Sequence, residues 1–219
     1  MTDAPTRTWN DLVIPAAGTY QLDEAHQRIG FLAMHMMVSP VRGEFATGSA
    51  TIHVAEDPLA SSVSASIGAD SITTHHADRD THLRSPDFLD VENHPTLEFR
   101  STGIEWQPRP DPIFSWAALK GRAPDRTSGL GPAALATTSR FVLHGNLTIR
   151  GITRPVALDA EFGGAGTDPY GRHIFGFSAE AEIEREDFGL LWNVALEAGG
   201  VLVAKKVRIE LAGEAIRVE

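Results

Sequence analysis

Residues 28–39, RIGFLAMHMMVS, indicate the fold class most directly, because apolar side chains alternate along them with the period of a β-strand. A strand with this pattern presents two faces. The faces carry Ile29, Phe31, Ala33 and His35 on one side and Leu32, Met34, Met36 and Val38 on the other. Since both faces are largely apolar, both have to be covered, which predicts a strand in a sheet that wraps around an interior or packs between layers.

Segments with the same period continue on both sides of this strand, and turns that contain Gly, Pro or Asn separate them. The segments are residues 18–22, 43–54, 61–69, 96–104, 141–150, 155–162, 172–184 and 201–211. Little helical periodicity lies between them, so we predict an all-β fold. We predict that the strands close into an extended, eight-stranded antiparallel barrel, because such a barrel leaves no free edge and can enclose one small ligand.

The composition indicates one globular domain and excludes several functions. The chain has 219 residues, of which 42% are hydrophobic, so a sizeable core is available. A formal net charge of −10 opposes binding to nucleic acid, which requires a basic surface. No cysteine is present, which rules out disulfides, thiolate catalysis and Cys-ligated metals.

The start of the chain shows no recognisable targeting segment. Residues 1–20 lack the basic start, the apolar run and the small-residue cleavage site of a signal peptide. No apolar stretch approaches the roughly 20 residues of a membrane helix. We therefore expect a cytoplasmic protein with an N-terminal arm over residues 1–17 and a single barrel domain over residues 18–219.

Two regions interrupt the pattern of strands. Residues 71–95 form a short polar island that holds Arg79, Asp80, His82 and Phe88. A polar insert of this kind in a β protein predicts a short helical cap over one end of the barrel. Residues 106–140 are rich in proline and glycine and are unusually long for a connection within a compact domain. We expect them to be a surface excursion, with a second lid or an oligomer contact as the alternative.

Four separated blocks, in the same order along the chain, carry a family resemblance. They are Tyr20-x-Leu22-Asp23-x-x-His26, Arg79-Asp80-x-His82-Leu83-x-Ser85-x-x-Phe88, Gly145-x-Leu147-Thr148-Ile149-x-Gly151 and Arg185-x-Asp187-Phe188-Gly189. Over residues 18–218 the chain resembles the YceI-like lipid-binding family. The resemblance implies a lipocalin-like barrel with helical pieces at one end and an apolar tunnel that holds a polyisoprenoid or an isoprenoid quinone. Members of the family commonly carry a signal peptide, and the absence of a recognisable one in this sequence departs from that pattern.

The candidate ligand-binding residues combine apolar side chains of the strands and cap with two polar side chains of the cap. They are Ile29, Phe31, Met36, Val38, Phe45, Val63, Ile67, Arg79, His82, Leu83, Phe88, Phe99, Leu143, Phe175, Phe177 and Phe188. Each ligand methylene buried against such a wall is worth about 0.8 kcal/mol. The alternative is that the apolar side chains simply fill the barrel.

Three other functions stay open. A hydrolase or isomerase of prenyl or acyl substrates could use His82 with Asp80 as acid and base, but no G-x-S-x-G elbow is present. A metal-binding module could draw on the nine histidines, for example on His26, His35 or His144 across strands. No H-E-x-x-H motif or acidic calcium loop supports it. A ligand-free module with a collapsed tunnel could instead bind a partner protein.

The combined prediction is a non-catalytic protein that binds, stores or transports a long apolar ligand. We expect no catalytic residue, no metal and no cofactor other than a bound polyisoprenoid or isoprenoid quinone. The expected partner is therefore a lipid-like small molecule. We expect no nucleic acid and no membrane span, and a homodimer is left open.

Overall fold

A computed structural model describes residues 4–10, 12–36, 38–107, 140–194 and 202–218. Most of the segment 106–140 lies outside these ranges, so its expected role stays a prediction. The helices and strands are β1 (Thr6–Trp9), β2 (Leu12–Pro15), β3 (Gly18–His35), β4 (Ser39–Phe45), β5 (Gly48–Val54), η1 (Pro58–Ala60), β6 (Ser62–Gly68), η2 (Ala69–Ser71), β7 (Ile72–Thr73), α1 (Ala77–Arg84), β8 (Thr96–Gln107), β9 (Arg140–Ile149), β10 (Ile152–Thr167), β11 (His173–Glu184), η4 (Arg185–Phe188) and β12 (Val203–Arg217).

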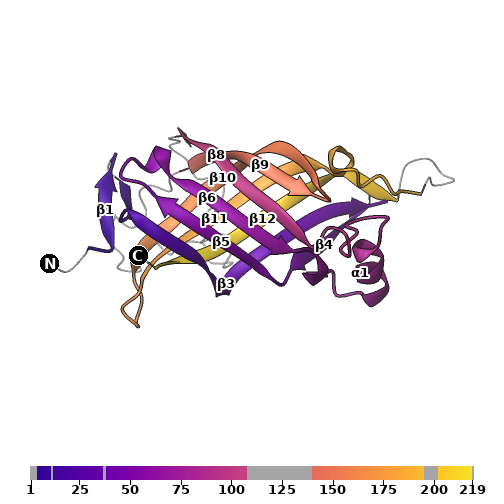
Figure 1. Ribbon diagram of the computed structural model, residues 1–219, viewed down its shortest axis with the longest axis horizontal. Coiled ribbons are helices and arrows are strands. Elements are labelled where there is room, and N and C mark those ends of the chain that lie inside the picture. The colour runs from indigo at the N-terminus through magenta and orange to yellow at the C-terminus, as the bar shows by residue number, and fades with distance from the viewer. Residues whose placement is uncertain (1–3, 11, 37, 108–139, 195–201, 219) are drawn as a thin grey trace.

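The predicted eight-stranded antiparallel barrel is confirmed. One sheet runs in the order β12-β11-β10-β9-β8-β6-β5-β3-β4-β7, and β12 also pairs with β3. This pairing, with Leu211 opposite Ile29, closes the ring and leaves β4 and β7 as an extension beyond β3. The long strands run obliquely along the molecule and give it an elongated shape (Figure 1). Closure matters for function because it surrounds the inward-facing apolar side chains on all sides.

Strand β3 joins the two segments that the alternation pattern separates, 18–22 and 28–39. One edge of β3 pairs with β12, whereas its other edge pairs with β5 through residues 18–21 and with β4 through residues 29–35. The strand ends at His35, before the predicted limit, because Met36 adopts a left-handed backbone (φ 52°) and turns the chain into β4.

The prediction of one strand over residues 43–54 is wrong. The chain leaves the strand conformation at Ala46 and Thr47, between β4 and β5. The break lets two short strands follow the same edge of the long β3, one after the other. Alternation of side chains does not reveal such a corner, because both halves keep the same period.

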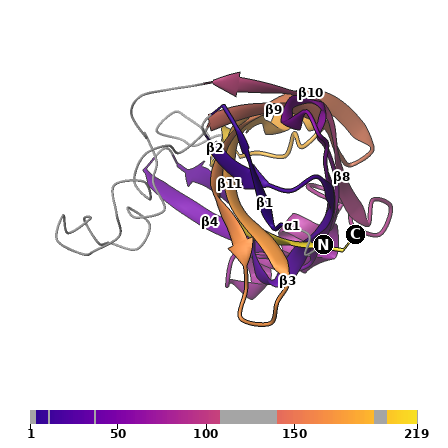
Figure 2. The ribbon, with the colours of Figure 1, turned by 90° about the vertical axis from the view of Figure 1, so that its left-hand side faces the viewer.

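The N-terminal segment, for which an arm is predicted, folds as a hairpin of β1 and β2. Figure 2, which looks at the left-hand end of Figure 1, shows this hairpin lying across the end of the barrel. Leu12 and Ile14 are buried, while Val13 between them faces outward and is 58% exposed. The Trp9 ring packs edge-on against Trp106, with 5.1 Å between the ring centroids. The hairpin therefore covers one opening of the barrel with apolar side chains.

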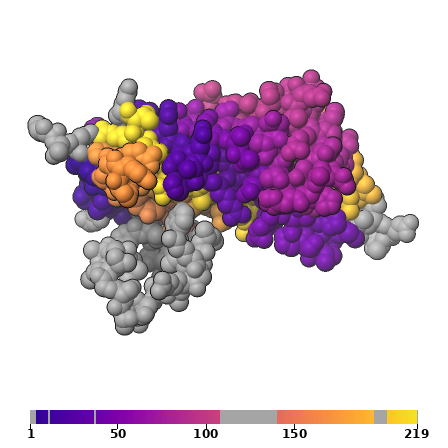
Figure 3. Space-filling view, turned by 90° about the horizontal axis from the view of Figure 1, so that it is seen from below, coloured from indigo at the N-terminus to yellow at the C-terminus, as the bar shows by residue number. Residues whose placement is uncertain are grey.

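The opposite end carries the cap, residues 71–95. Its helix α1 lies at the right-hand end of Figure 1, and the purple to magenta atoms of this region cover the same end in Figure 3. After α1 the cap continues in turns up to β8. No helix of the described ranges is long and apolar enough to cross a membrane.

Candidate ligand-binding cavity

An apolar cavity of about 410 Å³ lies inside the barrel. Its wall includes Ile14 and Pro15 from the hairpin at one end and Leu83, Phe88 and Leu89 from the cap at the other. Aliphatic and aromatic side chains from the barrel strands make up most of the wall between them. The volume falls within the range of about 300–1,000 Å³ that is typical of pockets for small organic ligands.

Most of the predicted wall residues line this cavity. They are Ile29, Phe31, Phe45, Val63, Ile67, Leu83, Phe88, Phe99, Leu143, Phe175 and Phe177. They come from β3, β4, β6, β8, β9, β11 and the cap, so the barrel brings together residues that are far apart in the sequence. Their contact with a ligand stays a prediction.

Three predicted wall residues lie elsewhere. Met36 and Val38 are 43% and 80% exposed, because β3 ends before them and both lie in the turn that precedes β4. Phe188, in η4, is buried in the main hydrophobic cluster and does not line the cavity. Alternation places none of the three on the cavity face, because Met36 and Val38 alternate opposite Ile29 and Phe31, and Phe188 lies beyond the end of β11.

The polar residues of the cap hold its backbone in place. Asp80 is buried and accepts hydrogen bonds from the Thr74 amide at 2.8 Å, from Thr73 Oγ1 at 3.1 Å and from the Thr74 hydroxyl. Arg79 donates from Nε to Thr74 Oγ1 at 2.6 Å and from Nη2 to the Thr74 carbonyl at 3.0 Å. Arg79 and Asp80 thus converge on Thr74 and tie α1 to the strand segment before it, and Arg79 does not line the cavity.

His82 is half-buried in the cap and does not line the cavity. Its Nε2 is 2.8 Å from Asp87 Oδ2, and its ring meets Phe88 and Trp192 edge-on at centroid distances of 5.0 and 4.5 Å. The carboxylate of Asp80 is occupied by Thr73 and Thr74 instead. The structure therefore does not assemble the acid–base pair of the enzyme alternative.

Sequence reasoning misses the polar members of the wall. Gln27, Glu161 and Arg185 line the cavity, and each has a buried polar atom without a hydrogen-bond partner. Burial raises the pKa of the Glu161 carboxyl, and the nearby Arg140 opposes that rise. Arg185 stands in one of the four sequence blocks, but its burial depends on the packing of distant strands.

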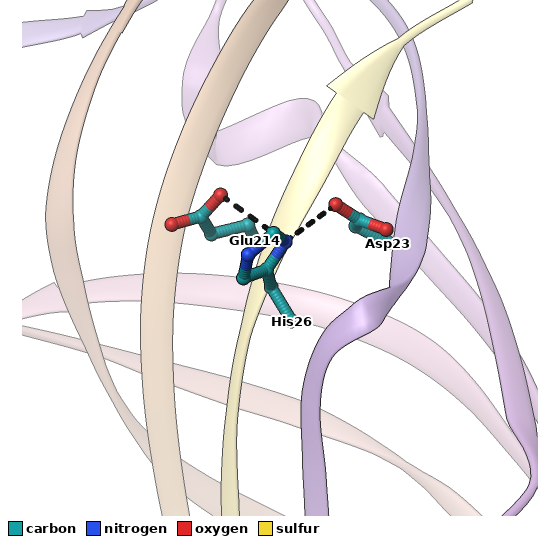
Figure 4. Close-up of side chains that lie close together, drawn as sticks. All are labelled: Asp23, His26 and Glu214. Atoms are coloured by element: carbon teal, nitrogen blue, oxygen red, sulfur yellow. Dashed lines mark hydrogen bonds and ion pairs between the residues drawn. The ribbon is translucent and has the colours of Figure 1, made fainter. Parts of the chain in front are cut away.

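One cluster within the described residues has the donor set of a metal site, namely Asp23, His26 and Glu214 (Figure 4). It forms where β3 bulges away from β12. Leu22 pairs with Ala215 and Gln27 with Gly213, so residues 23–26 lie opposite Glu214 alone. Such bulges leave residues unpaired and redirect side chains. The predicted candidates His35 and His144 do not join the cluster.

The electrostatics of this cluster favour an ion pair over a metal centre. His26 Nδ1 is 2.8 Å from Asp23 Oδ2 and 4.0 Å from Glu214 Oε2. The hydrogen bond with Asp23, aided by the charge of Glu214, raises the pKa of His26 above its ordinary value, and the same bond lowers the pKa of Asp23. A metal would have to displace the proton that this arrangement stabilises on the imidazole.

Replacing Asp23 with asparagine is expected to lower the pKa of His26 towards its ordinary value of 6.5. The substitution removes the negative charge that stabilises the imidazolium form. The pKa is measured by following the His26 ring signals in NMR spectra over a pH series. Glu214→Gln is the matched control and should lower the pKa less, because Glu214 is more distant. An unchanged His26 pKa in Asp23→Asn would contradict the ion pair.

The fold and the cavity define the class of protein as a closed antiparallel barrel around an apolar pocket. Residues 20–215 match the family model described as the YceI-like domain, and the chain belongs to this family. A UPF0312 protein of Pectobacterium atrosepticum is 32% identical over 204 residues, which cover 92% of this chain and 88% of that protein. A UPF0312 protein of Pseudomonas aeruginosa is 32% identical over 205 residues, with the same coverage.

Solved structures share the fold at lower sequence identity. BcnA of Burkholderia cenocepacia superposes with a TM-score of 0.62 at 17% identity, over 88% of this chain and 98% of that one. A domain of Saccharophagus degradans, described as a polyisoprenoid binding domain, superposes with a TM-score of 0.59 at 11% identity, over 92% and 99% of the two chains. These likenesses support the barrel architecture.

Proposed function

We propose that the protein binds a long apolar molecule, a polyisoprenoid or an isoprenoid quinone, inside the barrel and stores or carries it without converting it. The observation that carries this proposal is the apolar cavity that extends from the hairpin to the cap. The likeness to a domain described as polyisoprenoid-binding supports the choice of ligand class.

The physical basis of binding is the removal of hydrocarbon from water. Each buried methylene contributes about 0.8 kcal/mol, so several isoprene units outweigh the free energy lost on association, which is about 4–15 kcal/mol. The wall has few polar groups, so water gains little by staying in the cavity and an apolar ligand can displace it. Selectivity for an elongated ligand follows from a cavity that reaches both ends of the barrel.

The side chains that suggested catalysis have structural partners, which supports a non-catalytic role. Asp80 holds Thr73 and Thr74, and His82 pairs with Asp87. The hydroxyl of Ser101, another side chain of a nucleophilic type, accepts a hydrogen bond from the Val63 amide at 2.8 Å.

Native mass spectrometry of the purified protein, followed by organic extraction, tests the proposal. We expect a bound apolar molecule, or uptake of a prenyl alcohol or isoprenoid quinone by protein stripped of lipid, at one molecule per chain. A ligand-free mass together with no uptake of either compound would refute it. Turnover of a prenyl or acyl ester that is lost in His82→Ala would establish the enzyme alternative instead.

A further inference from the structure

Arg185 is a charged side chain buried beside an apolar cavity. It lines the cavity and is only 2% exposed. Its Nε donates to the Ala204 carbonyl at 3.0 Å and its Nη1 donates to the Leu190 carbonyl. Its Nη2 is buried and has no hydrogen-bond partner. Two donors thus fix the guanidinium in place, and a third is left without an acceptor.

No described carboxylate forms a salt bridge with Arg185. The neighbouring Glu186 pairs with Lys205, with 2.8 Å between Nζ and Oε2. Arg28, which also lines the cavity, differs because Glu210 lies 3.7 Å from its guanidinium. Burial of an unpaired charge is unfavourable by several kcal/mol, so proteins rarely keep one without a compensating partner. The missing partner of Arg185 is therefore an acceptor that the described chain does not provide.

The position of Arg185 places this acceptor at the cap end of the cavity. Arg185 opens η4, directly after β11. Leu190, whose carbonyl accepts a hydrogen bond from Arg185, belongs to the hydrophobic cluster that also contains Leu89 and packs against Leu83 of the cap. A ligand group bound to Nη2 would lie near the cap, and the apolar wall would extend from there towards the hairpin.

The other unpartnered polar atoms of the wall are oxygens, Gln27 Oε1 and Glu161 Oε1. They do not attract an anion, so Arg185 distinguishes the cap end chemically from the rest of the cavity. Guanidinium groups bind carboxylate and phosphate oxygens with charge-assisted hydrogen bonds, which are about twice as strong as neutral ones.

We propose that Arg185 binds the acidic head of an amphiphile, a carboxylate or a phosphate monoester, while the apolar tail of that molecule runs along the barrel towards the hairpin. This inference rests on the proposed function and narrows its ligand to a polyisoprenoid with an acidic head, which excludes an isoprenoid quinone. It adds a defined orientation, with the head at the cap and the tail end at the hairpin.

The test compares four ligands with tails of equal length. Geranylgeranyl phosphate, geranylgeranoic acid, geranylgeraniol and the hydrocarbon phytane each displace a fluorescent apolar probe from protein stripped of lipid. We expect at least one acid to bind about tenfold or more tightly than the alcohol and the hydrocarbon, as one charge-assisted hydrogen bond provides. The two acids differ in affinity according to which head the site accepts.

Variants at Arg185 test whether this residue causes the preference for an acidic head. Arg185→Met should remove the advantage of the acid and retain phytane binding, and Arg185→Lys should restore part of the advantage. Arg154→Met is the matched control, because Arg154 is exposed and lies outside the cavity wall, and it should behave as wild type. If Arg185→Met does not fold, the preference for acids over the alcohol and phytane is compared between the wild type and Arg185→Lys, and a smaller preference in Arg185→Lys supports the role of Arg185.

The outcomes separate this inference from the proposed function. If phytane binds as tightly as both acids, the acidic head is refuted and apolar binding stands. If Arg185→Met folds and keeps the preference for the acid, the role of Arg185 is refuted. If none of the four ligands binds, the inference is refuted, and uptake of an isoprenoid quinone then decides whether the proposed function stands.

Discussion

Replacing Ala65 with tryptophan is expected to weaken binding of the apolar ligand by about 100-fold. Ala65 lies on β6, opposite Phe99, and lines the cavity. An indole at this position would fill space that ligand methylenes otherwise occupy. Displacing about four methylenes costs about 3 kcal/mol, which corresponds to roughly 100-fold in affinity. The dissociation constant of a prenyl alcohol, obtained by fluorescence titration, measures the change.

Ser64→Trp is the matched control for this substitution. Ser64 precedes Ala65 on the same strand, is exposed, and does not line the cavity. The control should bind the ligand as the wild type does, and thermal unfolding should show that both variants remain folded. Wild-type affinity in a folded Ala65→Trp variant would place the ligand outside the barrel.

Replacing Asp80 with alanine is expected to destabilise the protein by about 3 kcal/mol, because it leaves buried donors of Thr73 and Thr74 unpaired. For a chain of this size, each kcal/mol lowers the melting temperature by about 2–4 °C. We therefore expect a fall of about 10 °C in thermal unfolding followed by circular dichroism. Faster hydrogen exchange of the Thr74 amide would show that the cap loosens.

Asp78→Ala is the control for the Asp80 substitution. Asp78 is exposed in the first turn of the same helix, so its removal tests the charge at the helix start without breaking buried hydrogen bonds. It should lower the melting temperature by only about 1–3 °C, since such charges contribute about 0.3–1 kcal/mol. Equal losses in the two variants would contradict a special role for Asp80.

The pH dependence of stability follows from the same hydrogen bonds. Burial of Asp80 raises its pKa, but hydrogen bonds from Thr74 and Thr73 outweigh burial and hold the pKa below the ordinary 3.8. The folded state therefore binds a proton less readily than the unfolded state. The contribution of Asp80 to stability is complete above pH 3.8 and is lost as the pH falls through the lowered pKa of the folded state.

The local pattern of the sequence was sufficient for most of the barrel wall. Phe31, Val63 and Phe99 alternate with outward-facing neighbours on three strands, and all three line the cavity. A period of two assigns each side chain to a face without knowledge of the partner strand. The prediction that Met36 and Val38 also contact the ligand took residues from the opposite face, and both are exposed because the left-handed Met36 ends the strand.

In the cap, too, the sequence predicted the helix but not the partners of its polar side chains. The polar island and its helix follow from residues close in sequence, and α1 forms within the predicted segment. The partners of its polar groups were not predictable. Asp80 accepts hydrogen bonds from Thr73 and Thr74 rather than pairing with Arg79. The His82 ring meets Trp192, which is more than a hundred positions away, edge-on.

The spacing of neighbouring side chains was enough to predict most strands of the barrel, their apolar faces and the cap, but not the β1–β2 hairpin or the break between β4 and β5. That β3 is one long strand with neighbours β12, β5 and β4, and that the hairpin covers one end, became apparent only in the folded chain. So did the burial of the Arg185 guanidinium on an apolar wall with one amino group unpaired. Burial and pairing depend on segments that meet only after closure of the barrel.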